Sequence, residues 1–394
     1  MNQFGFQRSK STTDAMLNFI ENIYADLNNG KHVLGVSIDM RKAFDTVCHD
    51  ILLRKLYKYG VRGVPLSWLR SYMMARTQCV RIGTSTSQSR LVSHGVPQGS
   101  VLGPILFLMY INDLPNISDN AKLTLFADDT TLTLADLDYN SMISSANSTL
   151  SDIYRWTVNN RLSLNAEKTS ALLFTNRLAC IVSPSLLNVN SVPVFFDTNF
   201  KFLGTTIDSK LNFSNHINLI CAKVSRTAGV LTRVRSFVPM HVLINLYYAL
   251  VYPYLLYGIL VWGDTAAVHL KPLEVLQKKI IRIITSSNFF SPSLPLFYEN
   301  RILRLKDIFH YQLGIFMYGR RALGQLPYPQ HSYETRYCEN VVVSFQRLTQ
   351  CRKSLSFSGP RLWNSLPVSV RESSSVFVFK KKYKNYLLDQ YNDV

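Results

Sequence analysis

The sequence has few acidic residues for its length. Its 394 residues include 25 Asp and Glu against 43 Lys and Arg, which gives a formal net charge of +18 and an isoelectric point of about 9.6. Such an excess of positive charge favours a polyanionic partner, either a nucleic acid or an acidic membrane surface. The length is ample for a large hydrophobic core and for several subdomains.

The cysteines lack the Cys-x-x-Cys spacing of zinc-binding motifs. All six lie singly along the chain, at Cys48, Cys79, Cys180, Cys221, Cys338 and Cys351. This pattern is typical of reduced thiols in an intracellular protein and gives no sign of a zinc knuckle. The first residues are polar and do not form a signal peptide. We therefore expect an intracellular protein, nuclear or cytoplasmic, that is not secreted.

Long apolar runs are also scarce, and one stretch resembles a membrane span. Residues 242–262 carry no charge and are long enough to cross a bilayer. However, Asn245 and Pro253 interrupt the stretch, and several tyrosines are spread along it. We predict a buried helix pair broken near Pro253, and no membrane partner.

What the chain does have is a pair of adjacent acids at an expected hairpin turn. Asp128 and Asp129 lie between two runs of apolar and β-branched residues, 123–125 and 130–134, which are typical of strands. Neighbouring carboxylates repel each other, and a divalent cation with a preference for hard oxygen ligands, such as Mg²⁺, would neutralise them. Asp-rich turns are also common on solvent-facing hairpins, so this pair leaves both interpretations open.

A third acid follows a buried strand. Residues 33–38 form an apolar run that ends at Asp39, and apolar residues at helical spacing predict a helix over residues 40–57. Asp39 can therefore either cap that helix or bind a metal at the strand end. Together the three acids are the kind of cluster that two-metal phosphoryl transfer needs. Asp45, at the expected start of the helix, is interpreted as structural.

Three segments in order resemble a known family. They are residues 39–47 (DMRKAFDTV), residues 95–104 (GVPQGSVLGP) and residues 126–129 (FADD). This set resembles the palm of reverse transcriptases, and most of all that of non-LTR retrotransposon (LINE-type, jockey-like) enzymes. The resemblance implies an RNA-directed DNA polymerase that extends a primer 3′-hydroxyl with dNTPs on an RNA template.

The resemblance also implies roles for individual acids. Asp39, Asp128 and Asp129 would be catalytic and would bind two Mg²⁺ ions, with Mn²⁺ as an alternative ion. A pattern from Trp156 to Thr169 is similar to the family's fourth palm motif and makes Lys168 a candidate general acid for the departing pyrophosphate. A solvated surface lysine is the alternative for Lys168.

Three further residues are implied to contact the substrate. Phe44 resembles a steric gate, in which a rigid ring leaves no room for a ribose 2′-hydroxyl; ordinary helix packing is the alternative. Gln98 offers a donor and an acceptor near the nascent base pair. Gly99 has no Cβ, so a base or sugar can approach its backbone closely.

The expected fold class is α+β, a right-hand polymerase palm with an antiparallel sheet and packed helices, partial fingers, and a helical thumb and C-terminal region. We predict a remnant of the fingers over residues 1–30, the palm with inserted finger helices over 31–200, a thumb-like helical region over 201–290 and a region of unknown role over 291–394. Within the thumb-like region, Phe202-Leu203-Gly204 resembles the primer-grip hairpin.

Residues 4–12 resemble a fingers motif that family members carry well inside the polymerase, with Gln7 in place of an arginine. We therefore expect an N-terminally truncated chain, without the earlier fingers strands and the endonuclease domain. Two functional hypotheses follow: an active polymerase domain, or a catalytically inactive remnant that binds nucleic acid.

Overall fold

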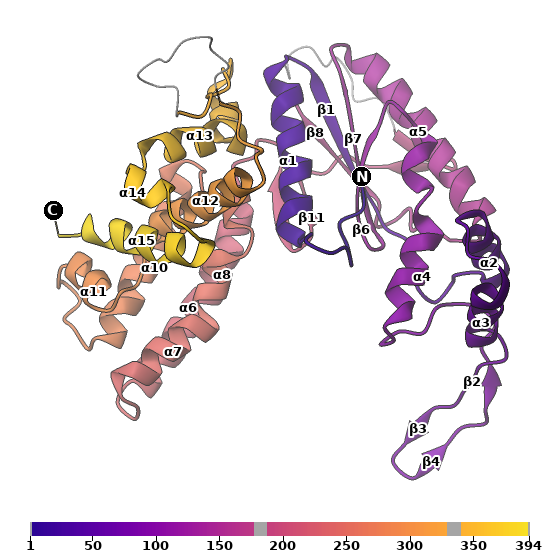
Figure 1. Ribbon diagram of the computed structural model, residues 1–394, viewed down its shortest axis with the longest axis horizontal. Helices are drawn as coiled ribbons and strands as arrows, with labels where there is room; N and C mark the ends of the chain where they lie inside the picture. Colours follow the sequence, from indigo (N-terminus) through magenta and orange to yellow (C-terminus); the bar gives the residue numbers. More distant parts are fainter. Residues whose placement is uncertain (1, 177–186, 329–339, 393–394) are drawn as a thin grey trace. The chain divides into compact units, whose positions relative to one another are not determined.

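The computed structural model describes residues 2–176, 187–328 and 340–392, and the chain divides into two compact units. The first unit comprises residues 1–19 and 29–203, and the second comprises residues 20–28 and 204–394. Helix α1 (Thr12–Asn28), drawn in indigo in Figure 1, has residues 12–19 in the first unit and residues 20–28 in the second. The α+β fold class expected from the sequence is confirmed.

The first unit is built around an antiparallel sheet with the strand order β6-β7-β1-β8. Its elements after α1 are β1 (His32–Ile38), α2 (His49–Lys58), α3 (Gly63–Met73), β2 (Thr77–Gln78), β3 (Arg81–Ile82), β4 (Ser85–Thr86), β5 (Arg90–Leu91), α4 (Leu102–Ile111), the 3₁₀ helix η1 (Leu114–Ile117), β6 (Lys122–Phe126), β7 (Asp129–Asp136), α5 (Tyr139–Asn159), β8 (Ser170–Phe174), β9 (Leu187–Val189), β10 (Val192–Val194) and β11 (Asn199–Phe202).

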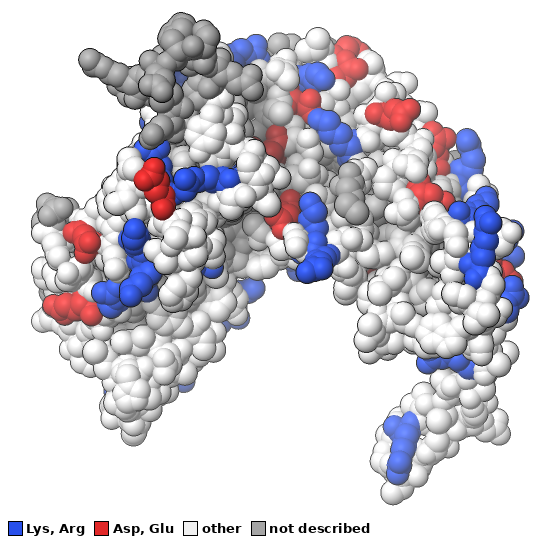
Figure 2. Space-filling view, viewed as in Figure 1, with Lys and Arg blue, Asp and Glu red and all other residues white. Residues whose placement is uncertain are grey.

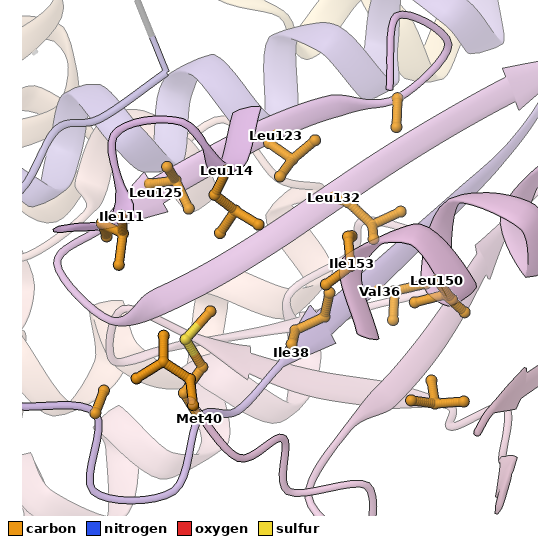
Figure 3. Close-up of a cluster of buried hydrophobic side chains, with 14 of the residues drawn as sticks. Val36, Ile38, Met40, Ile111, Leu114, Leu123, Leu125, Leu132, Leu150 and Ile153 are labelled. Atoms are coloured by element: carbon orange, nitrogen blue, oxygen red, sulfur yellow. The ribbon is translucent and has the colours of Figure 1, made fainter. Parts of the chain in front are cut away.

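Strand β1 is buried on both faces because helices cover the sheet from both sides. Side chains alternate along a strand, so Val36 and Ile38 point to one face and Gly35 to the other. Figure 3 shows Val36 and Ile38 in one apolar cluster with Leu132 of β7 and Ile153 of α5. On the opposite face, Gly35 lies against α1 and β8. The apolar composition of residues 33–38 is the sequence signature of this central strand.

The predicted helix over residues 40–57 is wrong at its beginning, because α2 starts only at His49. Met40 forms a β-bridge with Leu164, and the Arg41 N–H donates to the Ser163 carbonyl oxygen at 2.8 Å. These bonds hold the backbone extended where a helix would have to begin. Residues 41–46 form turns instead, so Asp45 lies in a turn and does not start a helix.

Other sequence predictions about the first unit are confirmed. The acidic pair lies at the β6–β7 turn. Segment 202–204 links the end of β11 to β12 (Thr205–Asp208), at the point in the sequence where the first unit ends and the second begins. Cys48, Cys79, Cys221 and Cys351 are free thiols, whereas Cys180 and Cys338 lie outside the described residues.

The second unit is helical apart from β12. Its helices are α6 (Ser214–Val234), α7 (Met240–Leu250), α8 (Tyr252–Leu256), α9 (Ile259–Trp262), α10 (Ala267–Ile284), α11 (Ser293–Glu299), α12 (Leu305–Ala322), the 3₁₀ helix η3 (Thr349–Lys353), α13 (Leu355–Ser365), α14 (Val368–Arg371) and α15 (Val376–Asp389). Helix α6 packs on α10, and α12 packs on α13 and α15. The buried Trp262, Trp363 and Tyr383 are among its largest core side chains.

The apolar stretch 242–262 is broken near Pro253, as predicted, but it forms three helices where a buried pair was expected, and Leu250 and Tyr254 are exposed. It spans most of α7, then α8 with Pro253 in its first turn, then α9 after Gly258. Among the described residues, none of the helices has the length and apolarity needed to cross a bilayer. Near the C-terminus, Asn364 of α13 exchanges hydrogen bonds with the backbone of Val341.

Two glycines of α12 provide a test of the packing in the second unit. A Cβ added at Gly314 would lie 2.3 Å from Cε1 of the buried Tyr383, whereas one added at Gly319 would meet nothing within 4 Å. We expect Gly314→Ala to lower the free energy of unfolding by about 1–3 kcal/mol through overpacking. Gly319→Ala should leave it unchanged or raise it by up to about 1 kcal/mol through helix propensity. Chemical denaturation of the two variants measures the difference, and equal effects would contradict the packing of α12 on α15.

Candidate active site

The β1–β7 ladder determines where two of the three acids lie. Ile38 pairs with Thr130 as the last residue pair of the ladder, so the next pair outward is Asp39 and Asp129. Residues directly opposite in an antiparallel pair project to the same face. Asp128 precedes Asp129 in the β6–β7 turn, where Ala127 has a left-handed φ of 54°. The structure therefore brings the three acids predicted from the sequence to one end of the sheet.

The three carboxylates interact electrostatically. Burial raises the pKa of Asp128, and repulsion from Asp39 raises it further. Burial also raises the pKa of Asp129, repulsion from Asp128 and Asp39 adds to the rise, and Lys201 on β11 partly opposes it. Raised pKa values mean that the negative charge of the cluster is not compensated by the surrounding protein. The negative charge at this end of the sheet would therefore attract a cation.

Asp39 is held by the turn that leads into β8. The Asn165 side chain donates to Oδ2 of Asp39 at 2.9 Å, and the Asn165 N–H donates to the Asp39 carbonyl oxygen at 2.8 Å. Lys168 lies in the same turn, three residues later, and its N–H donates to the Asn165 carbonyl oxygen. Its side chain is exposed and forms no ion pair with any described residue. The turn thus ties the segment of Lys168 to Asp39, although no direct contact joins their side chains.

The acidic turn is held from its other side by residues near the N-terminus. Oε1 of Gln3 accepts hydrogen bonds from the N–H groups of Ala127, at 3.0 Å, and Gly5, at 2.7 Å. The backbone of residues 2–4 also bonds to Leu125 in both directions, at 2.8 Å each. A Cβ at Gly5 would lie 2.3 Å from the Ala127 nitrogen, so only glycine permits this approach. Gln3 and Gly5 fix the turn that carries Asp128 and Asp129.

Phe44 lies beside the loop that contains Gln98. Its half-buried ring stacks on Phe107 of α4, with ring centroids 4.2 Å apart and an interplanar angle of 22°. The Phe44 carbonyl oxygen accepts from the Val96 N–H at 2.9 Å, and Oδ1 of Asp45 accepts from Nε2 of Gln98 at 2.8 Å. These bonds bring the two sequence motifs together. Stacking on Phe107 holds the Phe44 ring in one place.

The loop that precedes α4 leaves its backbone open to solvent. Gly99 has a φ of +77° and nothing within 4 Å of the position a Cβ would take. Ser100 caps the following helix, because its Oγ accepts from the Gly103 N–H at 2.9 Å. Gln98 lines a polar cavity of about 630 Å³ together with Lys42, Arg76 and His94. This loop therefore offers an accessible glycine and a side-chain amide next to Phe44.

The acid cluster suits a hard divalent cation by its chemistry. Its donors are carboxylate oxygens, which Mg²⁺ prefers, and their uncompensated charge is what such an ion would neutralise. Within residues 2–176, 187–328 and 340–392, no group of three or more His, Cys, Asp or Glu side chains is already arranged to hold a metal ion. The carboxylate oxygens are of the kind that Mg²⁺ prefers, and they lie at the same end of the sheet. Their side chains are not arranged as a closed coordination shell.

Sequence reasoning missed the two residues that fix the acidic turn. No local pattern distinguishes Gln3, and residues 4–12 show only a resemblance to a fingers motif. The clue available in the sequence was Gly5, a glycine next to aromatic residues. A glycine of this kind can mark a close backbone approach. Its partner, Ala127, lies more than a hundred residues away and was not predictable from local sequence.

Comparisons with known proteins identify the family of the chain. Residues 1–207 match the family model described as reverse transcriptase (RNA-dependent DNA polymerase). Similar curated proteins include the RNA-directed DNA polymerase from mobile element jockey of Drosophila melanogaster, 28% identical over 316 residues, covering 77% of this chain and 34% of that protein. The probable RNA-directed DNA polymerase from transposon BS of the same species is 30% identical over 305 residues, covering 73% and 33%.

The chain belongs to the reverse transcriptase family, and its relatives are of the non-LTR, jockey-like type. It spans about a third of the length of these curated relatives. Among solved structures, telomerase from Candida albicans in complex with a TWJ fragment of telomeric RNA is similar, with a TM-score of 0.44 and 11% identity. That likeness covers 77% of this chain and 55% of the telomerase chain.

The raised pKa values make a prediction for the ion-free protein. Asp128 and Asp129 bind protons more tightly in the folded than in the unfolded chain. Stability should therefore fall as the pH rises from the ordinary Asp pKa of 3.8 through the raised folded-state values. We expect Asp128→Asn to raise the free energy of unfolding at pH 7, with the gain vanishing at acidic pH where the carboxyl is protonated in both states.

Asp136, at the end of the same strand, is the matched control. Hydrogen bonds from the Asp138 N–H and from the Ser141 hydroxyl lower the pKa of Asp136. Asp136→Asn should therefore lower the free energy of unfolding at pH 7, opposite to the effect of Asp128→Asn. Urea denaturation between acidic and neutral pH in a chelating buffer measures both variants. A loss of stability in Asp128→Asn at pH 7 would contradict the mutual repulsion of the cluster.

Removing the Gln3 acceptor tests how the acidic turn is held. Gln3→Met keeps the length of the side chain but leaves the N–H groups of Ala127 and Gly5 without their partner. We expect the free energy of unfolding to fall by about 1–3 kcal/mol. Gln7→Met, in the same segment and without a side-chain hydrogen bond to a described residue, should change it little. Equal stability of the two variants would remove the role assigned to Gln3.

Proposed function

We propose that the chain is the polymerase domain of a non-LTR retrotransposon reverse transcriptase. It would bind an RNA template and a DNA primer and join dNTPs to the primer 3′-hydroxyl. In this proposal, residues 31–200 form the palm with inserted finger helices, residues 1–30 belong to the fingers and residues 201–290 to the thumb. Residues 291–394 have no assigned role. Family membership and the position of the acids support the assignment.

The observation that carries the proposal is the convergence of Asp39, Asp128 and Asp129 at one end of the sheet. These carboxylates would hold two Mg²⁺ ions. When bound, such ions activate the primer hydroxyl and neutralise the leaving pyrophosphate. The protein contributes the fixed position of the carboxylates, through the β1–β7 ladder, the Asn165 bonds to Asp39 and the Gln3 bonds to the turn.

Substrate selection is assigned to Phe44, Gln98 and Gly99. The Phe44 ring, stacked on Phe107, would occupy the space of a ribose 2′-hydroxyl, so that deoxynucleotides are favoured by exclusion. The open backbone at Gly99 lets a sugar or base approach, and the Gln98 amide, which already bonds to Asp45, can reorient toward a base pair. The amide at Gln98 and the ring at Phe44 lie on segments joined by hydrogen bonds, so they would act on one nucleotide.

Lys168 would act on the leaving group. Its ammonium is exposed and carries a charge that no described residue neutralises through an ion pair. It lies in the turn anchored to Asp39, so a modest side-chain movement would bring it toward phosphates bound at the acids. There it would donate a proton to the departing pyrophosphate or compensate its charge.

The thumb assignment rests on the basic face of α6. Arg226 and Arg233 are two turns apart and both exposed, so they share one side of the helix. Phosphates of a primer–template backbone are the natural counter-charge for such a row.

Primer extension tests the proposal directly. With an RNA template, a DNA primer, dNTPs and Mg²⁺, the chain should incorporate nucleotides, and Asp128→Asn should reduce incorporation by on the order of a hundredfold or more, the scale of single electrostatic groups in catalysis. Asp136→Asn, an acid on the same strand outside the cluster, should retain activity. Equal incorporation by wild type and Asp128→Asn would refute the proposal, and RNA binding without incorporation by the wild type would establish the inactive alternative.

The Phe44 assignment predicts a change in sugar selection. Phe44→Val should raise the incorporation of ribonucleotides relative to deoxynucleotides by about tenfold or more, because the space for a 2′-hydroxyl becomes open. Phe44→Tyr keeps the ring and should keep the selectivity. Single-nucleotide incorporation with dNTP and the matching rNTP gives the ratio. An unchanged ratio in Phe44→Val would leave Phe44 with a packing role only.

A further inference from the structure

A long segment of the first unit contains no acidic residue. Between Asp50 and Asp113 the sequence has neither Asp nor Glu. Its basic residues are Arg54, Lys55, Lys58, Arg62, Arg70, Arg76, Arg81 and Arg90. Lys55 is paired with Asp113 at 2.6 Å, while the others are exposed and form no ion pair with a described residue. Figure 2 shows Lys and Arg side chains gathered over α2 and α3 and near the end of the β3–β4 hairpin.

Helix α3 presents an aromatic stack beside these charges. Trp68 stacks on Tyr72 with ring centroids 5.9 Å apart and an interplanar angle of 17°, and the Arg76 guanidinium lies 5.5 Å from the Tyr72 centroid. Trp68 is 57% exposed. The other tryptophans differ, because Trp262 and Trp363 are fully buried and Trp156 is partly buried. A tryptophan stacked on one side and open on the other is a ready platform for one more flat ring.

The stack leads into an extended arm formed by strands β2 to β5 (Figure 1). The Arg76 carbonyl oxygen accepts from the Val92 N–H at 2.8 Å, and Gln78 pairs with Arg90. Side chains two residues apart in a strand project to the same face, so Arg76 and Gln78 share a face. Because Gln78 pairs with Arg90, Arg76 and Arg90 lie on one side of the arm. Arg81 on β3 adds a charge farther out, next to the exposed Ile82.

We propose that one surface of this region binds single-stranded RNA at a site separate from the acid cluster. This surface, called the arm surface, consists of Trp68, Tyr72, Arg76, Arg81 and Arg90. A base stacks on the open face of Trp68, and successive phosphates contact the arginines along the arm. Stacking requires unpaired bases, which a duplex does not offer. No acidic residue within the segment repels a polyanion, and at its inner end the acid Asp45 lines one cavity with Arg76. The proposal does not depend on polymerase activity.

Tryptophan fluorescence tests the stacking part of the proposal. The full chain carrying Asp128→Asn is titrated, without nucleotides, with an unstructured RNA of about 12 nucleotides, a length within the range of known single-strand sites. RNA should quench the emission of Trp68. Trp68→Ala should weaken binding by about tenfold, and Trp68→Phe should keep most of the affinity while losing the quenching. Phe195→Ala removes an aromatic ring that is 70% exposed elsewhere in the same unit and should leave binding unchanged.

Salt dependence tests the phosphate contacts. The logarithm of the RNA-binding constant should fall linearly with the logarithm of the salt concentration. The magnitude of this slope should decrease by roughly 0.7 in each of the variants Arg76→Ala, Arg81→Ala and Arg90→Ala. Arg155→Ala is the matched control, because Arg155 is an exposed arginine that already pairs with Asp152 at 3.3 Å on α5. Its slope should equal that of the wild type.

Three results would overturn the proposal. They are wild-type affinity in Trp68→Ala with its circular dichroism unchanged, equal binding of a duplex RNA of the same length, and equal binding and quenching by polyglutamate or by phosphatidylserine vesicles. RNA binding by the arm surface is measured in a chain with Asp128 replaced, whereas primer extension is measured in the wild type. RNA binding at the arm surface can therefore be absent while primer extension succeeds, and it can be present while primer extension fails. The two conclusions are therefore tested separately.

Discussion

Electrostatic repulsion among three carboxylates at the end of a sheet is the constraint around which the first unit is organised. Burial and repulsion from the neighbouring acids raise the pKa values of Asp128 and Asp129, a cost that solvent-exposed, separated carboxylates would not carry. The protein keeps the three acids together because β1 lies at the centre of the sheet, covered by helices on both faces, and because its ladder with β7 continues to the last residue before the acids. Buried apolar packing thus opposes the repulsion at the site.

Hydrogen bonds from distant parts of the chain complete this support. Asn165 binds Asp39, Gln3 binds the backbone of the acidic turn, and the loop of Gln98 bonds to the segment of Phe44 and Asp45. Each of these partners is separated in sequence from the residue it holds. The candidate site is therefore a property of the assembled unit, and its electrostatics depend on contacts that form only when the fold is complete.

Local patterns were sufficient to predict the strand before Asp39 and the hairpin with the acid pair, because hydrophobic periodicity and turn residues determine such elements. The same reasoning failed over residues 40–48. There the apolar spacing suits a helix, but bonds to Ser163 and to the loop at Val96 hold the backbone in turns. Tertiary hydrogen bonds overrode the local preference. The hydrogen bond between Gln3 and the acidic turn was not predictable for the same reason, because its partner Ala127 is remote in sequence.

The central strand also constrains the length of the chain. Side chains in β1 alternate between the face of α1 and the face of α5, so the orientation of Asp39 depends on how many residues precede it in the strand. Inserting or deleting one residue there would leave the composition apolar and the strand buried, yet it would turn the carboxylate toward the apolar interior. Conservative exchanges within β1 should therefore be far less harmful to the site than the insertion or deletion of a single residue in the strand.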